Sequence, residues 1–247
     1  MYLSAVVITK NAELTLRSCI ISLKKVADEV IIVDSGSEDH TLSIAQDLEC
    51  RILNTKWLGY GETKNLGHQA ASFPYIISLD ADEELSDALI NEILAIKESL
   101  KHIYSFKRLN NFCGKWIKHG AWYPDVKTRI FPKEILWNNA HSHEELIISK
   151  NAVIVKLNSP LLHYAYQNLN QLKAKTSLYA KLGALEKQNK SKFSLSIKLL
   201  FSPLVGFLSS FFFKLGFLDG FSGLVISYYK AKGTLLKYYG ALVIKDK

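Results

Sequence analysis

Short apolar runs alternate with amphipathic stretches over the first hundred residues. The apolar runs are uninterrupted and rich in β-branched residues, which is typical of strands buried on both faces of a sheet. They cover residues 5–9, 30–33, 51–53 and 75–79. Between them, apolar positions recur at helical spacing. These stretches predict helices over 12–25, 41–48, 61–72 and 86–100. Strands that alternate with helices predict an α/β fold with a mostly parallel central sheet flanked by helices.

The pattern changes after residue 100. Further short strands are predicted at 104–109, 128–131 and 161–164, and they are separated by loops. From about residue 168 the chain is helical and basic, and it then becomes increasingly apolar. We therefore expect one α/β domain over residues 1–167 and a helical region over 168–247.

Polar side chains stand where three of the predicted strands end. Thr9, Asp34 and Asp80 close these strands, and Asn11, Ser35 and Asp82 follow them. In open α/β sheets, ligands bind beyond the carboxyl ends of parallel strands. The sequence therefore predicts a ligand site at this edge. Ser86 is the expected N-cap of the helix that follows, and Asp39 or Ser37 that of the helix over 41–48.

Two carboxylates two residues apart, Asp80 and Asp82, can present oxygens to Mg²⁺ or Mn²⁺ completed by substrate phosphates. An acidic strand-to-helix turn explains them equally well. An EF-hand loop is excluded because Leu85 stands where glycine is needed and Asn91 where glutamate is needed. Glycine-rich dinucleotide and P-loop motifs are absent from the sequence. Phosphates would therefore be held by metal and by Lys or Arg side chains.

Composition narrows the classes of protein further. With 48% hydrophobic and 22% charged residues, the chain can bury a core, and global disorder is excluded. Three widely spaced cysteines argue against a disulfide scaffold. The N-terminus lacks the basic segment of a signal peptide, so we expect a cytoplasmic protein.

The net charge of +8 is the sum of two opposed regions. Residues 1–100 carry −8, from 8 basic and 16 acidic side chains, whereas residues 101–247 carry +16, from 23 and 7. This asymmetry favours a polyanionic or membrane-surface partner, with a solvated basic surface as the equal alternative.

The C-terminal tail combines basic and apolar character. Residues 173–247 carry +10, from 13 basic and 3 acidic side chains. The longest uncharged apolar run, 199–213, has 15 residues and contains Pro203, whereas a membrane span needs about 20. We expect attachment to an anionic membrane surface; core helices that pack on the α/β domain are the alternative. Nucleic acid is not expected, because the basic residues form no binding motif.

These residues together resemble the signatures of family 2 inverting glycosyltransferases with the GT-A fold. The stretches that carry the resemblance are Thr9-Lys10-Asn11, 33–41, Lys64-Asn65 and 79–83. Further stretches are similar to the subgroup of lipopolysaccharide core β-1,4-glucosyltransferases that modify inner-core heptose. They are 122–125, 129–131, His143-Glu144 and 216–220.

The resemblance implies roles for the residues at the strand ends. Thr9, Asn11 and Asp34 would hold the nucleotide base and ribose, and Lys64 and Asn65 would lie near the donor. It also implies that residues 1–100 form the nucleotide-sugar half of the catalytic domain and 101–167 the acceptor half.

The resemblance also implies a metal and a base. Asp82 would be the principal ligand of Mg²⁺ or Mn²⁺, Asp80 would contact ribose or metal, and His143 would ligate the metal or orient its neighbour. Glu144 is assigned as general base, with Asp125 as the alternative. Arg129 can meet a donor or acceptor phosphate, and a structural ion pair is an equal alternative.

The function implied is transfer of a hexose, with UDP-glucose as the expected donor, onto an inner-core heptose. The acceptor would be a lipid-linked core oligosaccharide at the inner face of the cytoplasmic membrane, where the enzyme would be peripheral. Three alternatives stay open: a non-catalytic membrane-bound scaffold with this fold, a transferase for another cell-surface glycan, and a nucleotidyltransferase. The nucleotidyltransferase would need a phosphate-binding loop, which residues 9–12 do not supply.

Overall fold

The structure, a computed structural model, describes residues 2–139 and 144–245. The chain forms two compact units that do not follow chain order. One comprises Met1–Arg108 and Val126–His163, and the other comprises Leu109–Asp125 and Tyr164–Lys247. The segment Leu109–Asp125 therefore belongs with the C-terminal helices, although the α/β domain was expected to cover residues 1–167.

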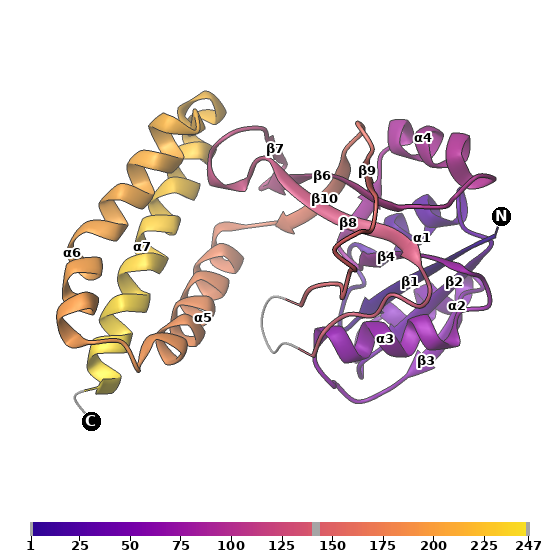
Figure 1. Ribbon diagram of the computed structural model, residues 1–247, viewed down its shortest axis with the longest axis horizontal. Coiled ribbons are helices and arrows are strands. Elements are labelled where there is room, and N and C mark those ends of the chain that lie inside the picture. Colours follow the sequence, from indigo (N-terminus) through magenta and orange to yellow (C-terminus); the bar gives the residue numbers. More distant parts are fainter. Residues whose placement is uncertain (1, 140–143, 246–247) are drawn as a thin grey trace. The chain divides into compact units, whose positions relative to one another are not determined.

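The first unit contains the predicted parallel strands, in the order β3-β2-β1-β4. They are β1 (Leu3–Thr9), β2 (Glu29–Asp34), β3 (Arg51–Asn54) and β4 (Tyr75–Asp80). The connecting helices are α1 (Leu16–Lys24), α2 (Thr41–Asp47), α3 (Tyr60–Ala70) and α4 (Asp87–Lys97). All four strands and all four helices predicted over residues 1–100 are present, with shifted ends (Figure 1).

Beyond β4 the sheet becomes mixed, and its order continues β8-β6-β10-β5. These strands are β8 (Asp125–Pro132), β6 (Ile103–Phe112), β10 (Leu161–Tyr166) and β5 (Glu83–Leu85). β8 pairs antiparallel with β4, and β5 pairs antiparallel with β10. Two further short strands, β7 (Lys115–Ile117) and β9 (Ile154–Lys156), pair with β6. The pattern did not predict β5, β7 or β9, because three residues are too few to show a period.

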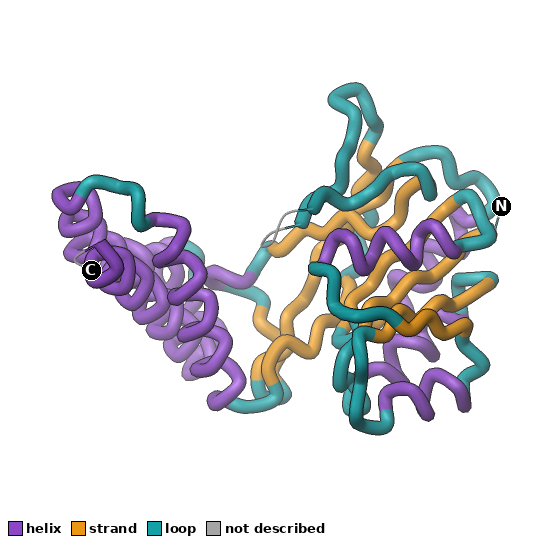
Figure 2. The backbone as a smooth tube through the Cα atoms, turned by 90° about the horizontal axis from the view of Figure 1, so that it is seen from below, coloured by secondary structure: helices purple, strands orange, loops and turns teal. Residues whose placement is uncertain are grey.

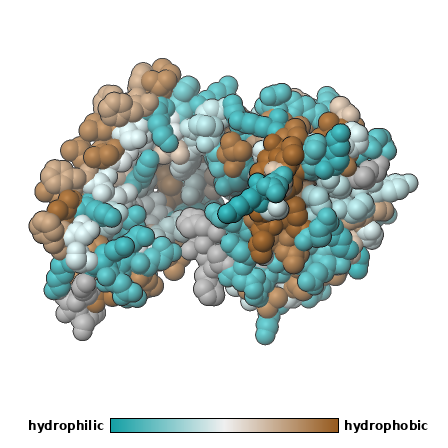
Figure 3. Space-filling model, viewed as in Figure 1, coloured by the Kyte–Doolittle hydropathy of each residue, from teal (hydrophilic) through white to brown (hydrophobic). Residues whose placement is uncertain are grey.

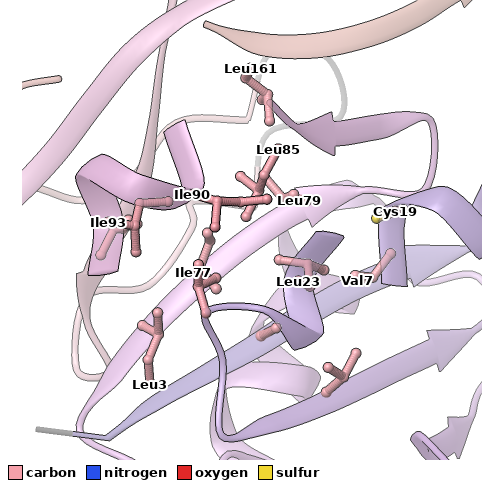
Figure 4. Close-up of a cluster of buried hydrophobic side chains, with 14 of the residues drawn as sticks. Leu3, Val7, Cys19, Leu23, Ile77, Leu79, Leu85, Ile90, Ile93 and Leu161 are labelled. Carbon is pink, nitrogen blue, oxygen red and sulfur yellow. The ribbon is translucent and has the colours of Figure 1, made fainter. Parts of the chain in front are cut away.

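The parallel strands are apolar on both faces because helices cover both. Along β1, Ala5 and Val7 join the core formed with α1 and α4, whereas Val6 and Ile8 face the other way. Figure 4 shows side chains from β1, α1, β4 and α4 meeting in the first of these cores. On the second face α3 packs tightly, and a Cβ on Gly67 would lie 2.3 Å from a Val6 methyl carbon.

The cap predicted for α4 is present, and the cap predicted for α2 is not. The Ser86 hydroxyl accepts from the Leu89 N–H at 3.2 Å at the start of α4, as predicted. At α2 the structure corrects the prediction: the N-cap residue is His40, whose side chain makes no cap hydrogen bond. Asp39, one residue earlier, accepts from the Thr41 N–H through its Oδ1 at 3.0 Å.

The second unit is mainly helical. Its main helices are α5 (Leu169–Lys187), α6 (Lys192–Leu208) and α7 (Gly220–Lys245). Two short helical turns, η2 (Ser209–Phe213) and η3 (Gly216–Asp219), connect α6 to α7. The three long helices lie side by side (Figures 1 and 2). The remaining turn, η1 (Gly120–Trp122), lies in the segment that joins this unit from earlier in the chain.

Candidate functional site

The carboxyl ends of β1, β2 and β4 bring three predicted site residues onto one sheet edge. Thr9 is in register with Asp34, and Asp80 is in register with Ile8, one residue earlier on β1. The parallel register therefore puts these three polar side chains on neighbouring strands. This is the arrangement that the alternation of strands and helices predicts.

The loop after β2 is organised by Asp34. Its buried carboxylate accepts from the N–H groups of Gly36 and Ser37, both at 2.9 Å, and from the Ser37 hydroxyl. Asn11 reaches the same loop: its backbone N–H donates to the Ser37 hydroxyl, and its side-chain oxygen accepts from the Glu38 N–H at 2.8 Å. The two residues therefore fix the shape of this edge through internal hydrogen bonds.

Two hydroxyls beside this loop are buried, those of Thr9 and Ser35. Within residues 2–139 and 144–245, neither side-chain oxygen has a hydrogen-bond partner. A buried hydroxyl that is left unpaired costs free energy. These two hydroxyls are therefore polar groups that lack a protein partner among the described residues. Ser35 was among the polar residues predicted at the strand ends, but no binding role was assigned to it.

A buried lysine joins two carboxylates that are distant in the sequence. Lys64 on α3 is only 1% exposed, and its ammonium lies 3.1 Å from Asp80 Oδ1 and 2.9 Å from Glu144 Oε1. It also lies 4.5 Å from the centre of the Trp137 ring. The structure thus brings the predicted donor-site lysine, the first aspartate of the pair and the predicted base into contact.

Arg129 on β8 completes the charge cluster. Its Nη2 donates to Asp80 Oδ2 at 2.8 Å and to Glu83 Oε1 at 2.6 Å. The guanidinium of Arg108 also meets Glu83, at 3.0 Å. The structural ion pair, one of the two alternatives for Arg129, is therefore present.

The cluster fixes the charge of its members. Burial by itself raises the pKa of the Asp80 carboxyl, but Lys64 and Arg129 outweigh burial and hold this pKa well below its usual range. Burial also disfavours the charged form of Arg129, and the carboxylates of Glu83 and Asp80 more than compensate, so its pKa is raised. Asp80 is therefore ionised at neutral pH.

Among the described residues, Asp82 contacts His163 rather than Lys64 or Arg129. Its Oδ2 lies 3.3 Å from Nε2 of His163, which β10 brings beside β5. The Asp82 side chain is 34% exposed. His163 was not predicted as a site residue, because nothing in the pattern of an isolated strand histidine shows which strand it will pair with.

The donor set allows a test of the predicted Mg²⁺ or Mn²⁺. No group of three His, Cys, Asp or Glu side chains able to hold a metal ion occurs among the described residues. His143 lies outside them. Both Asp80 oxygens already contact Lys64 and Arg129, so Asp82 is the carboxylate of the pair that is open to a cation. Since Mg²⁺ commonly uses one or two protein carboxylates together with substrate phosphates, these residues fit such an ion.

The segment that carries Glu144 is held by α3. Both polar atoms of the Asn65 side chain bond to the backbone of Trp137, one donating and one accepting, each at 2.9 Å. Trp137 in turn pairs with Leu146 across the segment, and Asn138 N–H donates to the Glu145 carbonyl at 2.8 Å. Neighbouring residues of α3 thus anchor the segment and contact Glu144.

A glycine allows this close approach. A Cβ on Gly61 would lie 2.0 Å from the Asn138 carbonyl oxygen, so α3 accepts the segment only because this position has no side chain. The alternative base, Asp125, begins β8 and belongs to the second unit.

The chain is similar to several known proteins. The chain is 32% identical over 246 residues to a protein of Rickettsia typhi named as an uncharacterized glycosyltransferase, covering 91% of this chain and 81% of that one. It is 28% identical to the lipopolysaccharide core biosynthesis glycosyltransferase LpsC of Rhizobium meliloti, covering 93% and 90%. Among solved structures, it is similar to Staphylococcus aureus TarS residues 1–349 in complex with UDP-GlcNAc. That likeness has a TM-score of 0.49 and 16% identity, and it covers 100% of this chain and 91% of that one.

The family description "Glycosyl transferase family 2" matches residues 4–154. This range includes the strand-end residues Thr9, Asn11, Asp34 and Ser35. It also includes the buried charge cluster that we call the Lys64 cluster, formed by Lys64, Asp80, Glu83, Arg108, Arg129 and Glu144. The α/β fold class and the family resemblance expected from the sequence are thereby confirmed. The chain belongs to glycosyl transferase family 2.

Proposed function

We propose that the protein is an inverting glycosyltransferase that moves glucose from UDP-glucose onto an inner-core heptose of lipopolysaccharide or lipooligosaccharide. The observation that carries the proposal is the Lys64 cluster, which puts a carboxylate, Glu144, beside the strand-end residues of a family 2 chain. The similarity to LpsC, whose name places it in lipopolysaccharide core biosynthesis, supports the acceptor class.

Glu144 is the proposed general base. An inverting transfer is a single displacement, so the acceptor hydroxyl must lose its proton as it attacks the anomeric carbon. A positioned carboxylate contributes about 10²–10⁴-fold to such a step. Lys64 contacts Oε1 of Glu144, and we assign Oε2 as the atom that takes the proton. Asp125 is the alternative base.

The leaving nucleoside diphosphate needs compensation for its charge. Lys64 and Arg129 are cations at this edge of the sheet. Because both are buried away from water, they would stabilise the developing negative charge more strongly than exposed cations would. Asp82, with Asp80, His163 or His143, would hold Mg²⁺ or Mn²⁺, and a bound ion would supply further positive charge to the diphosphate. Arg129 would meet a phosphate only in addition to its two carboxylate partners.

Binding of the nucleotide is assigned to the strand ends. The unpaired hydroxyls of Thr9 and Ser35 and the loop shaped by Asp34 and Asn11 would receive the base and ribose. Lys64 and Asn65 would lie near the donor. Residues 1–100 are thus the proposed nucleotide-sugar half, 101–167 the acceptor half and 168–247 the membrane-associating region.

The acceptor class sets the proposed location. A lipid-linked core oligosaccharide lies on the membrane, so the enzyme would act as a peripheral protein on the inner face of the cytoplasmic membrane. A transferase for another cell-surface glycan would share this location, and an acceptor screen separates the two.

The decisive experiment uses the full chain, UDP-glucose and detergent-solubilised core acceptor, with Mg²⁺, Mn²⁺ or EDTA. We expect Asp82→Ala to abolish transfer. Glu144→Gln should bind donor normally in calorimetry but lose about 10²–10⁴-fold in kcat. Glu145 provides the matched control, because it is adjacent to Glu144 and exposed. Glu145→Gln should keep full activity.

Each other result has a defined meaning. Full activity of Glu144→Gln together with loss in Asp125→Asn would move the base to Asp125. If the wild-type protein binds none of the common nucleotide sugars, the protein is a scaffold rather than an enzyme.

A further inference from the structure

Helix α6 and the following turn η2 expose one continuous apolar face. Its members recur at spacings of three and four residues, so they lie on one side of the helix. They are Phe193, Ile197, Leu200, Phe201, Leu204, Val205, Leu208, Phe212 and Phe213. Leu204 is 59% exposed and Phe213 is 83% exposed. Figure 3 shows apolar side chains gathered along the outer edge over α6. We call this set the apolar face.

The other side of α6 is already covered. Leu195 is fully buried and Leu199 partly buried, in a cluster with Ala184 of α5 and with Tyr238 and Ala241 of α7. The helix therefore satisfies its packing within the unit through one side only. The apolar face takes no part in the packing of the unit. A contiguous exposed apolar patch of this kind marks an interaction site.

The apolar face continues around the turn to α7. Phe217, Leu218 and Phe221 are all exposed there. Two hydrogen bonds join this turn to its neighbours. The Asp219 carboxylate accepts from the His119 N–H at 2.8 Å, and the hydroxyls of Ser210 and Ser227 are 2.8 Å apart. These three apolar side chains are therefore exposed on a turn that is fixed by hydrogen bonds.

Every exposed charged side chain of α6 and of the turn that follows it is a lysine. Lys192, Lys198 and Lys214 are exposed along α6 and at its end. The single acidic residue between positions 188 and 229 is Asp219, which is buried and bonded to the 118–119 backbone. An apolar stripe edged with lysines is complementary to an anionic lipid surface.

We propose that the apolar face docks on an anionic lipid bilayer, with α6 lying in the plane of the membrane. This inference rests on the proposed membrane location and gives it a surface and an orientation. A second copy of the chain fits less well, because an isologous contact through this face would bring equivalent lysines together.

Length alone would also allow α6 to span a membrane. The stretch Lys192–Phe213 has 22 residues and sufficient hydropathy, and it is the single such helix among the residues searched. However, α6 packs along α7, which carries Lys230, Lys232 and Lys237. A spanning α6 that kept this packing would draw these lysines into hydrocarbon, which is unfavourable. In the membrane plane, only the apolar face enters the lipid.

The test measures flotation of the full chain with vesicles of phosphatidylcholine and phosphatidylglycerol, and with phosphatidylcholine alone. We expect the wild-type protein to float with the anionic vesicles. Leu204→Ser/Phe213→Ser should reduce the partition coefficient at least about tenfold. The matched control is Leu94→Ser/Val153→Ser, which removes two exposed apolar side chains of the first unit and should change nothing.

The charge contribution is tested separately, in a variant that leaves the apolar face intact. Lys198→Gln/Lys214→Gln should weaken binding to anionic vesicles by about fivefold for each lysine at low salt. It should have little effect on binding to neutral vesicles. Equal binding of the wild-type protein and both double variants would overturn the proposal.

Two further results distinguish the alternatives. Alkaline carbonate should release the chain from membranes of expressing cells, and retention would overturn the in-plane orientation. Concentration-dependent dimerisation that Leu204→Ser/Phe213→Ser abolishes, without vesicle binding, would assign the face to a second copy. Transfer to a detergent-solubilised acceptor needs no bilayer, so failure of docking and failure of the proposed reaction are separate outcomes.

Discussion

Replacing Lys64 with methionine tests whether the buried charge cluster stabilises the fold as well as the site. The change keeps the length of the side chain and removes its charge. Asp80 and Glu144 then lose a cation that lies at 3.1 and 2.9 Å, while their side chains stay only 30% and 20% exposed. Removing one partner of a buried pair costs about 3–5 kcal/mol. We expect about 3 kcal/mol here, because both carboxylates keep some access to water.

The effect has a defined pH dependence. The lowered pKa of Asp80 stabilises the folded wild-type protein at pH values above the ordinary carboxyl pKa, and this stabilisation is lost as the pH falls towards the lowered folded value. Lys64→Met removes one of the cations that lower the pKa. The difference between the two proteins should therefore be largest near pH 7 and should shrink below about pH 4.

Urea unfolding at several pH values measures both quantities. The matched control is Lys25→Met, because Lys25 pairs with Asp87 at the same distance of 3.1 Å but with side chains that are 51% and 90% exposed. It should cost less than about 1 kcal/mol. If Lys64→Met cost no more than Lys25→Met, or if its cost did not change with pH, the reasoning would be refuted.

Two further predictions concern how α3 is packed. Gly67→Ala should destabilise the protein by about 1–3 kcal/mol, because the new methyl group would lie 2.3 Å from a valine side chain of β1. Gly206→Ala on α6, where a Cβ meets nothing within 4 Å, should instead stabilise the protein by up to about 1 kcal/mol. Thermal unfolding compares the Gly67→Ala and Gly206→Ala proteins. Equal effects on the unfolding temperature would contradict the close packing of α3 on β1. Asn65→Ala should destabilise by about 1–3 kcal/mol in urea unfolding, because it removes two hydrogen bonds to the Trp137 backbone. An unchanged midpoint would show that Asn65 does not hold the segment that carries Glu144.

The sequence predicted that polar side chains would gather at one edge of the sheet. Thr9, Asp34 and Asp80 each end an apolar run, and parallel pairing necessarily gathers such ends together. The partners of these residues were not visible in the same way. Glu83 was part of an expected acidic turn, yet it lies in β5 and is the buried acceptor for Arg129 and Arg108.

The amino-acid sequence by itself determined the succession of strands and helices over residues 1–100, the cap at Ser86 and the family, because each depends on local pattern. Tertiary structure decided which charges meet. Lys64 and Glu144 are 80 residues apart, and Asp82 meets His163 only because β10 lies beside β5. It also decided that one side of α6 is buried and the other exposed. These contacts depend on which distant segments pack together, and a one-dimensional pattern does not show which segment will lie beside a given residue.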